Sequence, residues 1–261
     1  MSGRLLVTGA SGYLGRELLR RSPGAVGASR GAGLRLDVRD LAAVRAALER
    51  LRPAAVIHTA YRRDDRATTL GGAVNVARAA AAVEARLIHL STDLVFDGRK
   101  DGAYTEEDEP GPIIAYGRDK ADAETAVREA HPEALVVRTA LLYGGAEPGP
   151  QERMATDPEA AFFTDELRSP VHVGDLAAAL LELAGGERSG FLHVAGAEVL
   201  SRYELARLLA PRPERVRAGT IAGSGLVRPR NCALSSARAR ALLRTRLRGA
   251  REVLEGGRPR P

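Results

Sequence analysis

The chain is poor in cysteine, aromatic residues and long apolar runs, and each shortage excludes a class of protein. Its 261 residues include a single cysteine, Cys232, so no internal disulfide or cysteine-rich metal site is available. That composition suits a reducing cytoplasm. No run of 18 apolar residues occurs, so we expect no membrane span and no membrane partner. The five histidines lack metal-ligand spacing, and we expect no metal site.

The net charge of +6 invites a nucleic-acid interpretation, which the rest of the composition opposes. The arginines are spread along the chain and alternate with acidic residues. Aromatic residues make up only 4%, so platforms for stacking bases are scarce. We therefore expect a small-molecule substrate and no nucleic acid, in a protein that is a monomer or a homodimer.

Short apolar runs alternate with longer helical patterns, which is typical of a parallel sheet covered on both faces. We predict strands at residues 4–8, 25–29, 54–58, 86–90, 134–138 and 190–194. We predict helices near 12–21, 40–51, 66–84, 115–130, 173–184, 201–210 and 235–247. Asp40 is a candidate N-cap, and Ser201 with Glu204 has capping-box spacing. Residues 97–113 and 144–170 are expected to be irregular.

These elements predict an α/β fold, a Rossmann-type doubly wound parallel sheet with a small C-terminal substrate lobe. We assign residues 1–143 to the domain that holds most of the sheet and residues 144–261 mainly to the substrate lobe. Within the second part, residues of about 171–195 are expected to return to the Rossmann core.

A glycine-rich turn follows the first predicted strand and opens the first predicted helix. It reads Thr8-Gly9-Ala10-Ser11-Gly12-Tyr13-Leu14-Gly15, with glycines in a G-x-x-G-x-x-G spacing. Such glycines allow a tight turn, approach of backbone N–H groups to a pyrophosphate, and close contact between helix and strand. The sequence therefore predicts dinucleotide binding, with the following contacts: Gly9, Ser11, Gly12, Tyr13 and Leu14.

The end of the second predicted strand indicates which dinucleotide is bound. An acidic residue there would grip the ribose diol of NAD, but this chain has Ser29-Arg30. Serine and arginine suit the 2′-phosphate of NADP, so we predict NADP(H) as the cofactor and residues 1–143 as an NADP-binding domain. Asp37 and Val38 are expected beside the adenine.

Lysine is almost absent, since only two of the 39 Lys+Arg residues are lysine, and Lys120 lies four residues after Tyr116. A helix places these two side chains on the same face, one turn apart. Tyr116 would donate a proton to a carbonyl oxygen, and Lys120 would lower the pKa of Tyr116 and hold the nicotinamide ribose. Thr92, at the end of a predicted strand, would orient the carbonyl. The alternative is a surface Tyr/Lys pair without catalytic work.

The chain resembles the extended short-chain dehydrogenases/reductases, specifically the dTDP-4-dehydrorhamnose reductase group. This resemblance implies NADPH-dependent reduction of a 4-keto-6-deoxy nucleotide sugar, an oxidoreductase reaction of deoxysugar biosynthesis, with Thr92, Tyr116 and Lys120 as catalytic residues. It also implies cofactor contacts at Thr59, Ala60, Tyr61, Ser91 and Thr139, and places Asp93 against the sugar. The matching motifs, in chain order, are residues 5–15, 56–61, 88–98, 104–107, 115–120, 137–144 and 169–177.

The chain also departs from that group on the substrate side. Leu94 stands where the group usually has tyrosine, which removes a polar contact, and the segment between Gly144 and Phe163 is short. Arg168 and Arg230 are candidates for a substrate diphosphate or are surface charges. Leu94 disfavours a 4,6-dehydratase, which would need Thr-Asp-Glu. Two alternatives stay open: a nucleotide-sugar epimerase, and a catalytically silent NADP-binding subunit resembling the regulatory subunit of methionine adenosyltransferase.

Overall fold

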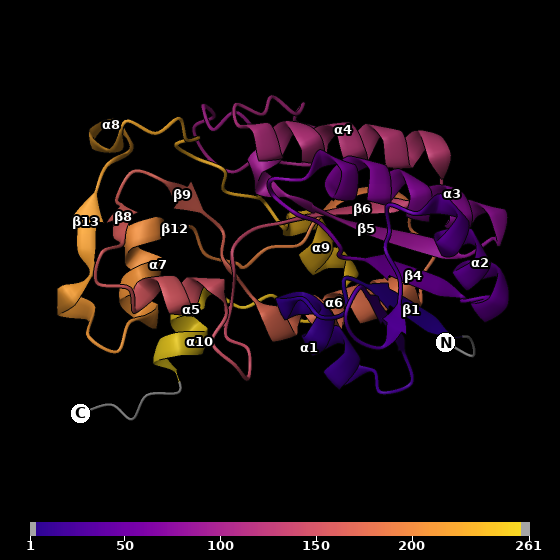
Figure 1. Cartoon of the computed structure of the whole chain (residues 1–261). Helices are drawn as coiled ribbons and strands as arrows, with labels where there is room; N and C mark the ends of the chain where they lie inside the picture. Colours follow the sequence, from indigo (N-terminus) through magenta and orange to yellow (C-terminus); the bar gives the residue numbers. More distant parts are fainter. Residues whose placement is uncertain (1–3, 257–261) are drawn as a thin grey trace. The chain divides into compact units, whose positions relative to one another are not determined.

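The computed structural model describes residues 4–256, and the chain divides into two compact units (Figure 1). Unit 1 contains the chain up to Thr92, together with Ala115–Arg138 and Ala177–Leu192. Unit 2 contains Asp93–Ile114, Thr139–Leu176 and the chain from His193 onward. The predicted assignment of ligands to domains, with its boundary at residue 143, stays a prediction, because compactness assigns no ligand to either part.

A seven-stranded sheet with the order β11-β6-β5-β4-β1-β2-β3 forms the framework of unit 1. The pairs β1–β2, β1–β4, β4–β5 and β2–β3 are parallel, as predicted for a doubly wound sheet. The six predicted strands are all present, and β3 is an additional one that the pattern missed. The strands are β1 (Leu5–Thr8), β2 (Val26–Ser29), β3 (Leu34–Arg35), β4 (Ala55–His58), β5 (Arg86–Thr92), β6 (Leu135–Thr139) and β11 (Gly190–His193).

Helices cover both faces of this sheet, which explains why β1 and β4 are buried along their whole length. Figure 1 shows α3 and α4 on one side of the sheet and α1 on the other. One apolar cluster joins side chains of α2, α3 and α4 to the strands, including Val44, Val76 and Val127. The helices are α1 (Tyr13–Arg21), α2 (Leu41–Leu51), α3 (Gly72–Ala82), α4 (Ala115–Ala130) and α6 (Val173–Ala184).

Local signals set the starts of these helices. The Asp40 side chain accepts a hydrogen bond from Ala43 N over 3.0 Å, so the predicted N-cap is confirmed. A short π-helical turn, η1 (Ala67–Gly71), leads directly into α3, so the helix predicted near 66–84 is present with a wider first turn.

Unit 2 is built from short elements linked by long connections. Its strands are β7 (Leu142–Tyr143), β8 (Ala161–Phe163), β9 (Leu167–Arg168), β10 (Val171–His172), β12 (Leu200–Ser201) and β13 (Arg217–Gly219). Its helices are η2 (Asp93–Val95), α5 (Pro150–Ala155), α7 (Arg202–Leu209), η3 (Pro213–Arg215), α8 (Ile221–Ser224), α9 (Ala237–Leu242) and α10 (Ala250–Glu255). Ser201 and Glu204 form the predicted capping box at α7.

Two predictions for unit 2 are wrong. Residues 144–170 are not irregular throughout, because Pro150 begins α5 and the Glu152 side chain accepts hydrogen bonds from Gly144 N and Gly149 N. The helix predicted at 235–247 ends at Leu242, where the backbone turns extended. This turn allows the following segment to bury Leu247. Among the helices of residues 4–256, none is long and apolar enough to cross a membrane.

Candidate active site

The glycine-rich turn between β1 and α1 takes its shape from two glycines. Gly9 has a φ of +72°, and a Cβ there would lie 2.6 Å from Thr59 Oγ1, just past β4. A Cβ on Gly15 would overlap the backbone of the turn itself. Gly12 N donates to Gly9 O over 2.9 Å and closes the turn before α1 begins. The result is a bare backbone cradle at a helix N-terminus, which fits a dinucleotide diphosphate.

The other residues predicted to contact the cofactor at this turn differ in exposure. Ser11 is exposed, Tyr13 is half-buried, and Leu14 is buried beneath the helix. Since the Leu14 side chain faces the core, only its backbone is available to a ligand.

A cluster of charges lies just past the end of β2, where the adenosine ribose was predicted. Ser29 Oγ accepts a hydrogen bond from Ala32 N over 2.9 Å and donates to Ala32 O, so it closes the loop that carries the exposed Arg30. Hydrogen bonds from Arg39 hold the pKa of Asp37 at about 2, with a smaller contribution from the charge of Arg30. Sequence reasoning missed Arg39, which adds a second cation to this end of the sheet.

Val38 lies behind this cluster and has a structural neighbour. Its side chain is buried, and a Cβ on Gly72 would press against it. Its carbonyl oxygen accepts a hydrogen bond from Asn75 Nδ2 over 3.0 Å. Val38 therefore anchors α3 beside the loop that carries Asp37.

Thr59, Ala60 and Tyr61 follow the carboxyl end of β4, and this segment reaches α4. Thr59 Oγ1 donates to Thr8 O over 2.7 Å and ties this segment to the glycine-rich turn. Ala60 is half-buried, and the Tyr61 side chain is 49% exposed. The centroids of the Tyr61 and Tyr116 rings are 5.6 Å apart. A residue predicted to bind the cofactor therefore contacts the tyrosine predicted to be the proton donor.

Tyr116 and Lys120 lie one turn apart on α4, and Lys120 is almost completely buried. Lys120 Nζ donates to the carbonyl oxygen of Leu90 in β5, two residues before Thr92. Burial lowers the pKa of Lys120 to about 8, with a smaller opposing effect from Glu124. The lysine is therefore poised to change its charge near neutral pH, a property of many catalytic sites.

Two stacked histidines, His58 and His89, lie next to Lys120. The sequence alone indicated only that they belong to buried strands. His89 Nε2 lies 3.4 Å from Lys120 Nζ, and the His89 and His58 ring centroids are 5.3 Å apart. His58 Nδ1 lies 2.7 Å from Thr8 Oγ1 at the start of the glycine-rich turn. Burial lowers the pKa of His58 to about 3 and that of His89 well below its usual range. Both rings are therefore neutral, and His89 accepts from the lysine.

The remaining predicted residues on this side lie at strand ends. Ser91 and Thr92 are buried at the end of β5. Thr139, in unit 2, donates its hydroxyl to Val194 O over 2.7 Å, which ties β6 to the chain beyond β11. No group of three or more candidate metal ligands occurs within the described part of the chain.

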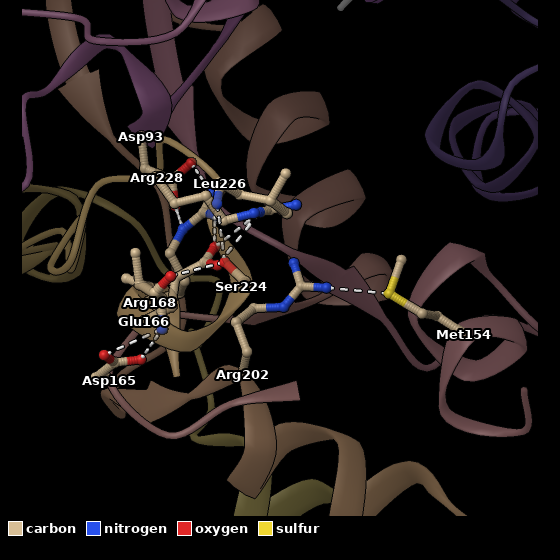
Figure 2. Close-up of polar contacts among 10 residues, drawn as sticks. Asp93, Met154, Asp165, Glu166, Arg168, Arg202, Ser224, Leu226 and Arg228 are labelled. Atoms are coloured by element: carbon tan, nitrogen blue, oxygen red, sulfur yellow. Dashed lines mark hydrogen bonds and ion pairs between the residues drawn. The ribbon is translucent and has the colours of Figure 1, made fainter. Parts of the chain in front are cut away.

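In unit 2, Asp93 is fully buried and bound by the guanidinium of Arg168 through both of its carboxylate oxygens (Figure 2). Although burial opposes it, Asp93 raises the pKa of Arg168. Arg168 also contacts Glu166, with Nη1 3.3 Å from Glu166 Oε1. The predicted sugar-facing acid and one predicted diphosphate ligand are thus bound to each other, 75 residues apart in sequence.

Figure 2 also shows Arg228 converging on the same buried Glu166, 3.2 Å from its Oε2. The Arg228 guanidinium carbon lies 5.5 Å from the centroid of the Phe163 ring. Phe163 also lines an open surface hollow of about 440 Å³ beside β8, β13 and α8. Sequence reasoning missed Glu166 and Arg228, because nothing local marks residues that pair across 62 positions.

The other two predicted substrate residues of unit 2 differ from this cluster. Arg230 lies on the surface and pairs with the exposed Asp101 over 3.2 Å. Leu94 is buried within η2, so its side chain belongs to the core. Cys232 is also buried, and burial raises its thiol pKa, which is unsuitable for a nucleophile.

Comparisons with known proteins match most of this chain. The family model described as the RmlD substrate binding domain matches residues 3–256. A dTDP-4-dehydrorhamnose reductase of Mycolicibacterium smegmatis is 36% identical over 286 residues, covering 98% of this chain and 85% of that protein. Methionine adenosyltransferase 2 subunit beta of Rattus norvegicus is 32% identical over 240 residues, covering 80% and 72%. The crystal structure of dTDP-4-dehydrorhamnose reductase from Bacillus anthracis in complex with NADP superposes with a TM-score of 0.86 at 26% identity, covering 98% of both chains.

Proposed function

The chain belongs to the RmlD substrate-binding family, and from that premise we propose an NADPH-dependent reductase of a 4-keto-6-deoxy nucleotide sugar. The observation that carries the proposal is the buried Lys120, which lies one helical turn from Tyr116 and donates to Leu90 O in β5, two residues before Thr92. A buried amine with a lowered pKa beside a phenol serves proton transfer. The bare glycine cradle in the same unit supports a dinucleotide cofactor.

The chemistry divides between the cofactor and the protein. Bound NADPH supplies the hydride that adds to the carbonyl carbon of the substrate. Tyr116 donates its phenolic proton to the carbonyl oxygen, and Thr92 orients that oxygen by a hydrogen bond. Lys120, while protonated, stabilises the Tyr116 phenolate left behind. The neutral His89 holds Lys120 in place without adding a competing charge.

Unit 2 contributes the residue that follows Thr92 in the chain. Asp93 faces the sugar in this proposal, and Arg168 fixes the orientation of its carboxylate. Because Arg168 is bound to two buried carboxylates, the diphosphate falls to a more exposed arginine. Arg230 fits that task, since its partner Asp101 is itself exposed and easily exchanged.

The direct test is oxidation of NADPH by a panel of nucleotide-linked 4-keto-6-deoxy sugars, followed by loss of nicotinamide absorbance. The Tyr116→Phe variant should lower kcat by about 10³-fold while NADPH affinity changes by less than about 3-fold. Absence of NADPH oxidation with every keto sugar would contradict the reductase assignment. Retained turnover in Tyr116→Phe would show that another group is the acid.

One relative favours a second candidate function. The similarity to methionine adenosyltransferase 2 subunit beta, together with the buried Leu94, is compatible with a binding-only NADP protein. Such a protein would bind NADPH, leave keto sugars unreduced and form a stable complex with a methionine adenosyltransferase catalytic subunit. A nucleotide-sugar epimerase is the third reading, and it would retain NAD rather than consume NADPH. The cytoplasmic location and the choice between monomer and homodimer stay predictions.

A further inference from the structure

Arg63 lies on the loop after β4, and its guanidinium covers the ring of Tyr116. The guanidinium carbon is 5.0 Å from the centroid of that ring. Tyr61 from the same loop contacts the same ring, with centroids 5.6 Å apart. A guanidinium within about 6 Å of an aromatic centroid is attracted to its face, so this loop holds the Tyr116 ring from outside α4.

Lys120 by itself is an unreliable source of positive charge for Tyr116. Its Nζ is bonded to Leu90 O and contacts His89, and burial lowers its pKa to about 8. Above that pH the lysine is mostly neutral. An arginine keeps its charge at every pH at which a protein is folded.

We propose that Arg63 is a positioning residue of the reaction, which holds the Tyr116 ring and supplies a permanent positive charge beside its phenol. The inference rests on the proposed function, in which Tyr116 is the acid. When a hydride from NADPH forms the new C–H bond, the π pair of the carbonyl moves to its oxygen, which takes the proton of Tyr116 as the phenolic O–H bond breaks. The tyrosine is left as a phenolate, which a nearby cation stabilises until water returns the proton.

The other charges around Tyr116 do not replace this contribution. Arg66 binds Asp119 and lies 2.8 Å from Asp122, so two carboxylates of α4 offset its charge. Arg63 forms no ion pair with any carboxylate of the described residues. Among the charged or titratable groups near Tyr116, Tyr61 and Arg63 contact its ring, and Lys120 lies one turn away on α4 above His89. Arg66, Asp119 and Asp122 bind one another beside the first half of α4, and Glu124 acts on Lys120.

The test compares Arg63→Gln with Arg62→Gln, which removes the same charge from the same loop. The Arg62 guanidinium lies 3.9 Å from the exposed Asp64, and its backbone bonds to Thr69 survive the change. Ultraviolet titration of the phenolate, with Tyr116→Phe as the blank, needs no substrate. Arg63→Gln should raise the pKa of Tyr116 by about 0.5–1, and Arg62→Gln should leave it unchanged.

Turnover gives the second readout. For Arg63→Gln we expect kcat to fall about 3-fold at pH 7 and about 10-fold at pH 9, where Lys120 has lost its charge, while KM for NADPH stays within about 2-fold. Arg63→Lys should restore most of the rate at pH 7. Equal behaviour of the Arg63→Gln and Arg62→Gln variants in both readouts would overturn the proposal. A change in KM for NADPH alone would also overturn it and make Arg63 a cofactor contact. If no keto sugar is reduced, the titration still decides whether Arg63 acts on the phenol, so the two failures are distinguishable.

Discussion

Lys120 in unit 1 and Arg168 in unit 2 are both buried cations at predicted site positions, yet their partners differ. Lys120 is bonded to a carbonyl oxygen and a neutral imidazole, and its pKa falls to about 8. Arg168 is bound to the carboxylates of Asp93 and Glu166, and its pKa rises although burial opposes this. One cation can gain or lose a proton near neutral pH, and the other is permanently charged.

This contrast separates chemistry from positioning. Lys120 acts on the pKa of Tyr116 and transfers no proton itself, so partners without charge suit it, and Leu90 O and the neutral His89 are such partners. A group that orients a neighbour needs a fixed charge, and a buried carboxylate pair provides that. Unit 1 therefore carries the proposed reacting groups, and unit 2 carries an ionic frame, the buried cluster of Arg168 with Asp93 and Glu166.

The largest effect should come from breaking that frame. Arg168→Met leaves Asp93 and Glu166 buried without their shared cation, so we expect a loss of about 3–5 kcal/mol in the free energy of unfolding. Lys120→Met leaves no buried carboxylate without its partner, so the free energy of unfolding should change by less than about 1 kcal/mol. Urea unfolding of both variants measures the difference. Equal losses of unfolding free energy in the two variants would contradict the proposed difference between Lys120 and Arg168.

The same contrast predicts that arginine fails in place of Lys120. Lys120→Arg keeps a positive charge, but the larger, planar guanidinium does not fit the site between Leu90 O and His89. We expect kcat to fall about 10²-fold in NADPH oxidation. Lys100→Arg is the matched control, because the half-exposed Lys100 pairs with Asp108 and should tolerate the exchange with unchanged rate.

Acid sensitivity should also differ between the units. Burial lowers the pKa of His58 to about 3. The contribution of the neutral ring to the free energy of unfolding is therefore complete above about pH 6.5 and is lost as the pH falls toward 3. In unit 2, burial opposes a low pKa for Asp175, but hydrogen bonds from His172 and Arg248 hold it well below its usual range. The Asp175 contribution is therefore lost only below about pH 4.

Between pH 7 and pH 5 the free energy of unfolding should consequently fall by about 2 kcal/mol through His58. His58→Gln should reduce this slope, and the buried His89, whose pKa is also lowered, should retain the rest. Urea unfolding at a series of pH values measures the slope. An unchanged slope in that variant would show that His58 does not contribute to the acid sensitivity.

The smallest effects should come from the helix caps, one in each unit. Asp40→Ala removes the bond to Ala43 N, and Ser201→Ala removes the bond to Glu204 N. Each should cost about 1 kcal/mol in thermal or urea unfolding, without a change in kcat. A loss of activity in Asp40→Ala would mean that α2 does more than support the sheet.

Much of unit 1 follows from local sequence patterns. The apolar runs predicted all six long strands, and the glycine spacing predicted the turn, because Gly9 needs a positive φ wherever that turn forms. The spacing of Tyr116 and Lys120 predicted a shared helix face. The two-residue β3 was missed, because a pair such as Leu34–Arg35 is too short to show alternation.

What the sequence determined by itself was the set of features that depend on neighbours along the chain: strands, helix caps, the glycine turn and the Tyr/Lys spacing. Only the tertiary structure decided that His89 lies beneath Lys120, that Arg63 covers Tyr116 and that Arg168 binds Asp93. The reason is physical. Backbone propensities act over a few residues, whereas charge pairing and ring contacts depend on which distant segments the packed fold brings within a few ångströms.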